Sequence, residues 1–115
     1  MNADEEFEMT MQAVEDIERL REFYEAGYHD AFLDNAVRKI IERQIARDEA
    51  DLAGIEHDLA EYEARYGMTS DDFWRQYQAG QLEDSAEFME WSVFCKMRQR
   101  LIAHLQILRG DTTRG

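Results

Sequence analysis

Two pairs of glutamates near the start of the chain have a spacing that could serve metal-dependent chemistry. Glu15 and Glu18, and likewise Glu22 and Glu25, are three positions apart, so each pair projects from one side of a helix. All-helical nucleotide pyrophosphatases use such pairs to hold Mg²⁺ against substrate phosphates, because this hard cation prefers oxygen ligands. A chain with 26 acidic residues contains this spacing by chance, and no matching lysine or arginine constellation for a triphosphate is evident. A solvated helix face is the favoured interpretation, with a magnesium-dependent nucleotide pyrophosphohydrolase as an alternative.

The histidines and the single cysteine add little catalytic chemistry. A di-iron site in a helix bundle needs Glu-x-x-His on two helices, whereas alanine, glycine and leucine stand three positions before His29, His57 and His104. One cysteine and three scattered histidines do not indicate a zinc site. Cys95 lies on an apolar helix stripe and is predicted to be a buried, inert thiol. We therefore predict no catalytic, cofactor-binding or metal-binding residues and no enzymatic activity.

The composition predicts a small, acidic, cytoplasmic protein. The 115 residues carry a net charge of −13 and include no proline, which favours long uninterrupted helices. This charge repels nucleic acid backbones and anionic membranes and attracts basic proteins. A lone cysteine excludes an intramolecular disulfide, and neither a signal peptide nor an apolar run long enough to span a membrane is evident. We expect a protein partner, with no direct binding to nucleic acid or membrane.

Apolar periodicity predicts an all-α fold in a single helical domain. An antiparallel hairpin of two long helices, joined by a short aromatic connector helix, is the simplest arrangement. A further helix at the N-terminus either completes a bundle or mediates pairing with a second copy. The predicted helical segments are 1–27, 30–66, 70–79 and 85–109.

Residue types that cap and stop helices mark the ends of these segments. Asp30, Thr69 and Asp84 precede helical patterns, and Asp72 and Glu87 stand three positions after the last two, as in a capping box. Glycine suits the residue that follows a helix. The predicted helix stops are Gly27, Gly67, Gly80 and Gly110.

The apolar stripe of the long segment suits that of the C-terminal segment, whereas the stripe of the N-terminal segment needs another partner. The stripe of the long segment is interrupted by Asp48, at a position where a coiled-coil-like seam would favour an apolar residue. Its members are Val37, Ile41, Ile45, Leu52, Ile55, Leu59, Tyr62 and Tyr66. The stripe of the N-terminal segment consists of Phe7, Met11, Val14, Ile17, Leu20 and Tyr24.

The segment 66–91 is rich in aromatic residues and is the predicted interaction site. Its large aromatic side chains cannot all face one thin two-helix core. They either lock the turn between the long helices or serve as exposed anchors, which dominate protein interfaces. Different faces of the segment could do both. The partner-facing candidates are Asp71, Asp72, Phe73, Trp74, Tyr77, Glu87, Glu90 and Trp91.

The same segment carries a family resemblance. The run YGMTSDDF at 66–73, followed by AGQL at 79–82 and then by Asp84, Phe88 and Trp91, resembles a YGM(S/T)S(D/E)(D/E)F…AG(E/Q)L…D…F.EW pattern. Small acidic prokaryotic proteins carry this pattern after a long charged helix, and they look like antitoxins encoded beside small toxins of the TumE type. The resemblance covers about residues 30–108 and implies an antitoxin role without identifying functional residues.

We predict a non-enzymatic protein-binding module, the antitoxin of a toxin–antitoxin pair, that neutralises a basic toxin from the adjacent gene by direct binding. Long acidic helices can lie along a basic partner, and complementary charge speeds association. The chain lacks a helix-turn-helix signature and a basic patch, so operator binding is not expected. A structural homo-oligomer built on the N-terminal and long helices is an alternative. DNA mimicry is another, and it would need carboxylates spaced like phosphates along one face.

Overall fold

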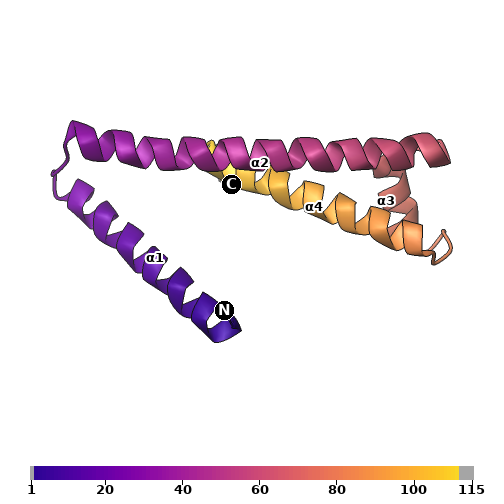
Figure 1. Ribbon diagram of the computed structural model, residues 1–115, viewed down its shortest axis with the longest axis horizontal. Helices are drawn as coiled ribbons and strands as arrows, with labels where there is room; N and C mark the ends of the chain where they lie inside the picture. The colour runs from indigo at the N-terminus through magenta and orange to yellow at the C-terminus, as the bar shows by residue number, and fades with distance from the viewer. Residues whose placement is uncertain (1, 112–115) are drawn as a thin grey trace. The chain divides into compact units, whose positions relative to one another are not determined.

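The computed structural model describes residues 2–111, which form four α-helices (Figure 1). The all-α class is confirmed, and each helix lies within its predicted segment. None of the helices in this range combines the length and the apolar character that crossing a bilayer requires. The helices are α1 (Ala3–Glu25), α2 (Ala31–Tyr66), α3 (Ser70–Gln78) and α4 (Ala86–Leu108).

The contacts within the chain define two units, which are described separately. The first unit ends at Lys39 and the second begins at Ile40, so α2 contributes its first turns to one unit and the rest to the other. The prediction of a single domain therefore stays a prediction.

The second unit is an antiparallel hairpin of α2 and α4 (Figure 1). Ion pairs mark its direction, since Arg109 lies 3.0 Å from Glu49 at one end while Arg65 pairs with Glu87 at the other. The predicted hairpin is thus confirmed. At the closed end α3 packs against α4, and Arg98 donates to Asp71 across 2.7 Å.

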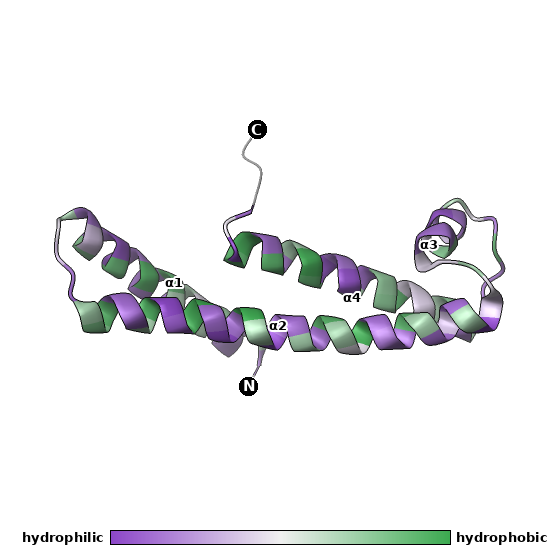
Figure 2. Cartoon of the chain, turned by 90° about the horizontal axis from the view of Figure 1, so that it is seen from above, coloured by the Kyte–Doolittle hydropathy of each residue, from purple (hydrophilic) through white to green (hydrophobic). Residues whose placement is uncertain are grey.

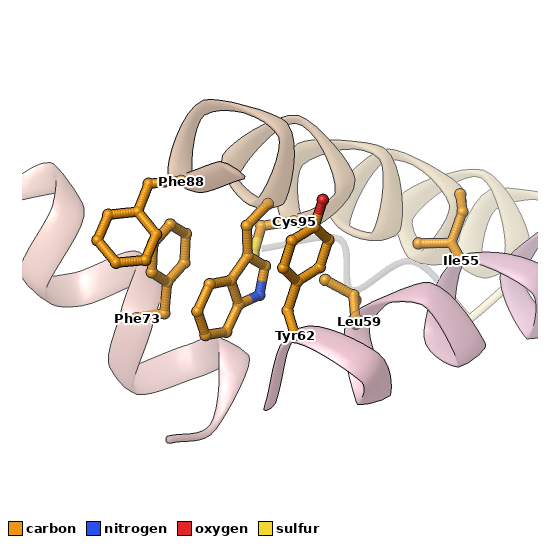
Figure 3. Packing of buried hydrophobic residues seen from close by; sticks show 7 residues of the cluster. Ile55, Leu59, Tyr62, Phe73, Phe88 and Cys95 are labelled. Atoms are coloured by element: carbon orange, nitrogen blue, oxygen red, sulfur yellow. The ribbon is translucent and has the colours of Figure 1, made fainter. Parts of the chain in front are cut away.

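The core of this unit lies where α2, α3 and α4 meet (Figure 3). It contains seven of the eight buried hydrophobic residues of the described structure, and fully burying a large apolar side chain stabilises a fold by about 1.5–3 kcal/mol. Its buried members are Ile55, Leu59, Tyr62, Phe73, Phe88, Trp91 and Cys95.

The connector between α2 and α4 follows the predicted stop and cap signals with one exception. Gly67 and Gly80 adopt φ of +65° and +70°, a left-handed conformation that favours glycine after a helix. Thr69 caps α3 by accepting a hydrogen bond from the Asp72 N–H across 3.0 Å. The predicted cap of α4 at Asp84 is wrong, because Ser85 accepts from the Phe88 N–H across 3.1 Å. Both residue types cap well, and the helix begins one residue later than the sequence pattern indicated.

In the first unit, an elbow joins α1 to the start of α2. Asp30 caps α2 as predicted, by accepting from the Leu33 N–H across 2.8 Å. The Tyr24 hydroxyl donates to Asp34 Oδ1 across 2.6 Å, and the His29 ring lies 3.1 Å from the other carboxylate oxygen. The hydrogen bond to Asp34 raises the pKa of Tyr24 to about 12. Between Ala3 and Glu25 no side chain is buried, so the role predicted for this helix in a bundle or a dimer stays a prediction.

Candidate protein-binding site

Trp91 is the centre of the aromatic cluster at the closed end of the hairpin. Its ring stacks on Phe73 with centroids 3.9 Å apart and planes within 5° of parallel. Tyr62 and Tyr66 also stack on it, at 5.4 and 5.7 Å. Aromatic pairs in such arrangements contribute about 0.5–1.5 kcal/mol beyond the area that they bury. Phe73 also stacks on Tyr77 along one face of α3, with centroids 5.3 Å apart.

A buried serine, which the sequence did not single out, joins the three helices by hydrogen bonds. The Trp91 Nε1–H donates to Ser70 Oγ across 3.0 Å, and Ser70 has no exposed surface. The Ser70 N–H in turn donates to Glu63 Oε2 across 2.7 Å. Each polar group of this buried site therefore has a partner, as buried polar groups require. Within residues 2–111, no buried side-chain nitrogen or oxygen lacks a hydrogen-bond partner.

The structure divides the aromatic candidates between core and surface. Phe73 and Trp91 have no exposed surface, so in this fold they support a binding surface instead of forming it. Trp74 and Tyr77 are half-buried against the same cluster and keep one side open to solvent. The spacing of these residues in the sequence did not separate the two groups.

Three of the four acidic candidates form ion pairs within the chain. Asp71 binds Arg98, Asp72 binds Arg75, and Glu87 contacts both Arg65 and the Tyr66 hydroxyl. The hydrogen bond to Glu87 raises the pKa of Tyr66. The pairs of Asp71 and Glu87 join helices at the closed end of the hairpin, whereas the pair of Asp72 lies within α3.

Glu90, the fourth acidic candidate, lies on an open groove between α2 and α4. The groove has a volume of about 250 Å³, and the Tyr62 and Phe94 rings form its apolar part. Arg65 is its only cation among the described residues, and the guanidinium carbon lies 5.6 Å from the centroid of the Tyr62 ring. The carboxylates that line the groove are Asp58, Glu61, Glu87 and Glu90.

No protein-family model, curated protein or solved structure matches the chain. The antitoxin resemblance therefore stays a prediction.

The glutamate pairs that suggested magnesium chemistry lie on the exposed surface of α1. Glu18 and Glu25 both bind Arg21, at 2.9 and 3.3 Å, and these contacts raise the pKa of the guanidinium. Across residues 2–111, no three carboxylate, imidazole or thiol groups converge in a way that could hold a metal ion. The described structure thus adds no support for a nucleotide hydrolase at Glu15 and Glu18.

Cys95 is buried in the aromatic cluster, as the sequence predicted. Only 1% of the residue is exposed, and its sulfur lies 4.0 Å from the Ser70 carbonyl oxygen. Burial raises the pKa of the Cys95 thiol to about 11. A thiol of this kind is a poor nucleophile at neutral pH, because only the thiolate reacts readily.

We expect the free energy of unfolding to fall as pH rises from about 9 to about 12. Burial raises the pKa of Cys95 from 9.0 to about 11, and burial together with Glu90 raises that of Tyr62 from 10.0 to about 12. Both groups are uncharged when protonated, and folding favours that form. The stabilisation that they contribute is therefore complete below the pKa that each group has in the unfolded chain. It is lost as the pH rises through the higher pKa of the folded protein. Urea unfolding across this pH range measures the decline.

The variants Cys95→Ala and Tyr62→Phe identify what these two groups contribute to the decline. Tyr24 and Tyr66, whose pKa values are also raised, add to it. We expect Cys95→Ala to move the start of the decline to higher pH. We expect Tyr62→Phe to reduce the loss of unfolding free energy at the alkaline end of the range. A wild-type stability that stays constant up to pH 12 would contradict the assignment of the buried groups.

Proposed function

We propose that the protein is a non-enzymatic, cytoplasmic protein-binding module, the antitoxin of a toxin–antitoxin pair, which neutralises a basic toxin by direct contact. The net charge of −13 favours a cationic partner. The sequence resemblance to antitoxins over residues 30–108 supports the same role. The observation that carries the proposal is the acidic groove between α2 and α4, with its aromatic floor.

The groove combines two features that recognise a lysine or arginine side chain. Glu61 and Glu90 are exposed and can pair with a cation that approaches from solvent. The half-buried Phe94 ring offers an apolar surface for the stem of such a side chain, since the buried Tyr62 ring already holds the guanidinium of Arg65. A basic side chain of the partner that enters here would find charge and an apolar surface together.

The buried aromatic cluster gives the groove a fixed shape. Tyr62 and Phe94 lie 6.2 Å apart between ring centroids, and Tyr62 is held from behind by its stack on Trp91. A preorganised surface loses less side-chain entropy on binding, which raises affinity. In this proposal the core candidates Phe73 and Trp91 act through the residues that they support.

Co-expression with the product of the adjacent gene tests the function. We expect the two proteins to elute together in size-exclusion chromatography and the toxin to lose activity in the complex. Two folded proteins that elute separately would refute the proposal. Turnover of nucleoside triphosphates in the presence of magnesium would instead favour the hydrolase alternative.

Charge reversal in the groove should weaken this complex. For the double variant E61K/E90K we expect the dissociation constant to rise at least about tenfold, or 1.4 kcal/mol, because like charges meet across the interface. Isothermal titration calorimetry measures the change.

The double variant E56K/E83K is the matched control for charge. It alters the net charge by the same amount at exposed carboxylates that lie outside the groove. Equal weakening by both variants would show that overall charge, and not the groove, carries the recognition.

A further inference from the structure

The apolar stripe of α1 and an apolar side chain at the start of α2 are left uncovered in the first unit. Ile17 of α1 is 62% exposed and Phe32 of α2 is 83% exposed. Figure 2 shows apolar residues recurring along both helices among hydrophilic ones. Helices in proteins take most of their stability from packing an amphipathic face, so faces like these need a partner. The exposed stripe residues of α1 are Phe7, Met11, Val14, Ile17 and Leu20.

The elbow presents these faces in a fixed arrangement. Besides the contacts of Asp34, the Phe23 and Tyr28 rings stack with centroids 5.4 Å apart. An open hollow of about 460 Å³ lies in the angle of the elbow, lined mainly by Leu20, Phe23 and Leu33. This hollow can accept apolar side chains from a helix that packs against the unit.

The charges of the two helices in this region are opposite. α1 contains nine acidic and two basic residues, a net charge of −7. Residues 31–47, which run from the start of α2 past Lys39 into the second unit, contain two acidic and four basic residues, a net charge of +2. A positive segment is unusual in a chain whose total charge is −13. A basic foreign protein would be attracted by α1 but repelled by this part of α2.

We propose that the elbow unit binds a second copy of this chain, with α1 of one protomer packed against the first turns of α2 of its partner. A two-fold pair makes this contact twice, since each protomer offers both surfaces. The four helices then form a bundle in which each acidic helix neighbours basic ones, and the two acidic helices lie on a diagonal. Opposite charges flank the apolar contact, and like charges are kept apart.

Sedimentation velocity on the full chain tests the proposal, which does not depend on the binding function proposed above. We expect a dimer at micromolar concentrations. Ile17→Glu should raise the dimer dissociation constant at least about tenfold, because it places a charge in the apolar contact. Met9→Glu is the matched control, since Met9 is 59% exposed on the same helix but lies outside the stripe.

Far-ultraviolet circular dichroism checks that each variant keeps its helices. Both tryptophans, Trp74 and Trp91, belong to the second unit, so their fluorescence adds only that the hairpin core is intact. A monomeric wild-type protein at high micromolar concentration would overturn the proposal. A dimer that tolerates Ile17→Glu as well as it tolerates Met9→Glu would do the same.

Salt dependence identifies which helices meet. If α1 faces α2 of the partner, added salt and the double variant R38E/R43E should each weaken the dimer, because both reduce the attraction between the helices. A dimer in which α1 pairs with α1 would instead be strengthened by salt and unaffected by R38E/R43E. That result would overturn the proposed pairing.

Discussion

Replacing Trp91 by alanine is expected to lower the free energy of unfolding by about 3–5 kcal/mol, the usual cost of deleting a buried tryptophan. The residue has no exposed surface and stacks on rings from both neighbouring helices, including Phe73 at 3.9 Å. Small domains have a total stability of about 5–15 kcal/mol, so this variant is expected to be partly unfolded at physiological temperature. Urea unfolding followed by far-ultraviolet circular dichroism measures the loss.

Val93→Ala on the same helix is the control for Trp91→Ala. Val93 is 52% exposed, so its truncation should change stability by no more than about 0.5 kcal/mol. If Trp91→Ala also cost less than about 1 kcal/mol, the aromatic cluster would not be the core that stabilises the hairpin.

Replacing Ser70 by alanine is expected to cost about 1–3 kcal/mol, far more than the loss of one hydroxyl would suggest. The change leaves the buried Trp91 N–H without an acceptor, because Ser70 Oγ is its partner at 3.0 Å. The hydrogen bond from the Ser70 backbone N–H to Glu63 is retained, so the helix start should be preserved.

A double-mutant cycle isolates the hydrogen bond between these two side chains. Trp91→Phe removes the donor, so in that background Ser70→Ala should be nearly neutral. Chemical denaturation of the four proteins gives the coupling energy. If the two substitutions were simply additive, the cost of Ser70→Ala would have to arise from the capping region and not from the indole.

The helices and their ends could be predicted because local chemistry determines them. Gly67 and Gly80 stop helices through a backbone conformation that other residues adopt at a cost, and Thr69 caps α3 through a hydrogen bond within one turn. The start of α4 was misplaced by one residue because Asp84 and Ser85 are both good caps. Residue preferences for helix caps cannot decide which of two adjacent residues caps a helix when both types cap well.

The candidate site was only partly accessible from sequence, because packing of distant segments decides burial. Phe73 and Trp74 are adjacent and similar in character, yet one is fully buried and the other half-exposed. Ser70 accepts a hydrogen bond from Trp91, which lies 21 residues further along the chain on α4. Glu63 accepts one from the Ser70 N–H, across the turn between α2 and α3. Such contacts leave no periodic signal in the sequence.

Asp48 shows that a break in a pattern can be informative. The sequence placed this residue on an apolar seam, and the structure buries it, with only 5% exposed. Gln44 Nε2 donates to the carboxylate across 3.0 Å, and the His104 ring lies 3.9 Å from its other oxygen. Periodicity alone identified Asp48 as an exception on the apolar stripe, but it could not identify His104 on α4 as the polar side chain beside it.

The local connectivity of the hairpin core has a kinetic consequence. All members of the main cluster lie between Ile55 and Cys95, so only short stretches of chain have to be closed before they meet. Helical topologies with local contacts fold in about microseconds to milliseconds. The hairpin core can therefore assemble soon after residues 55–95 have left the ribosome, and a newly made chain exposes its aromatic residues to aggregation or proteolysis only briefly.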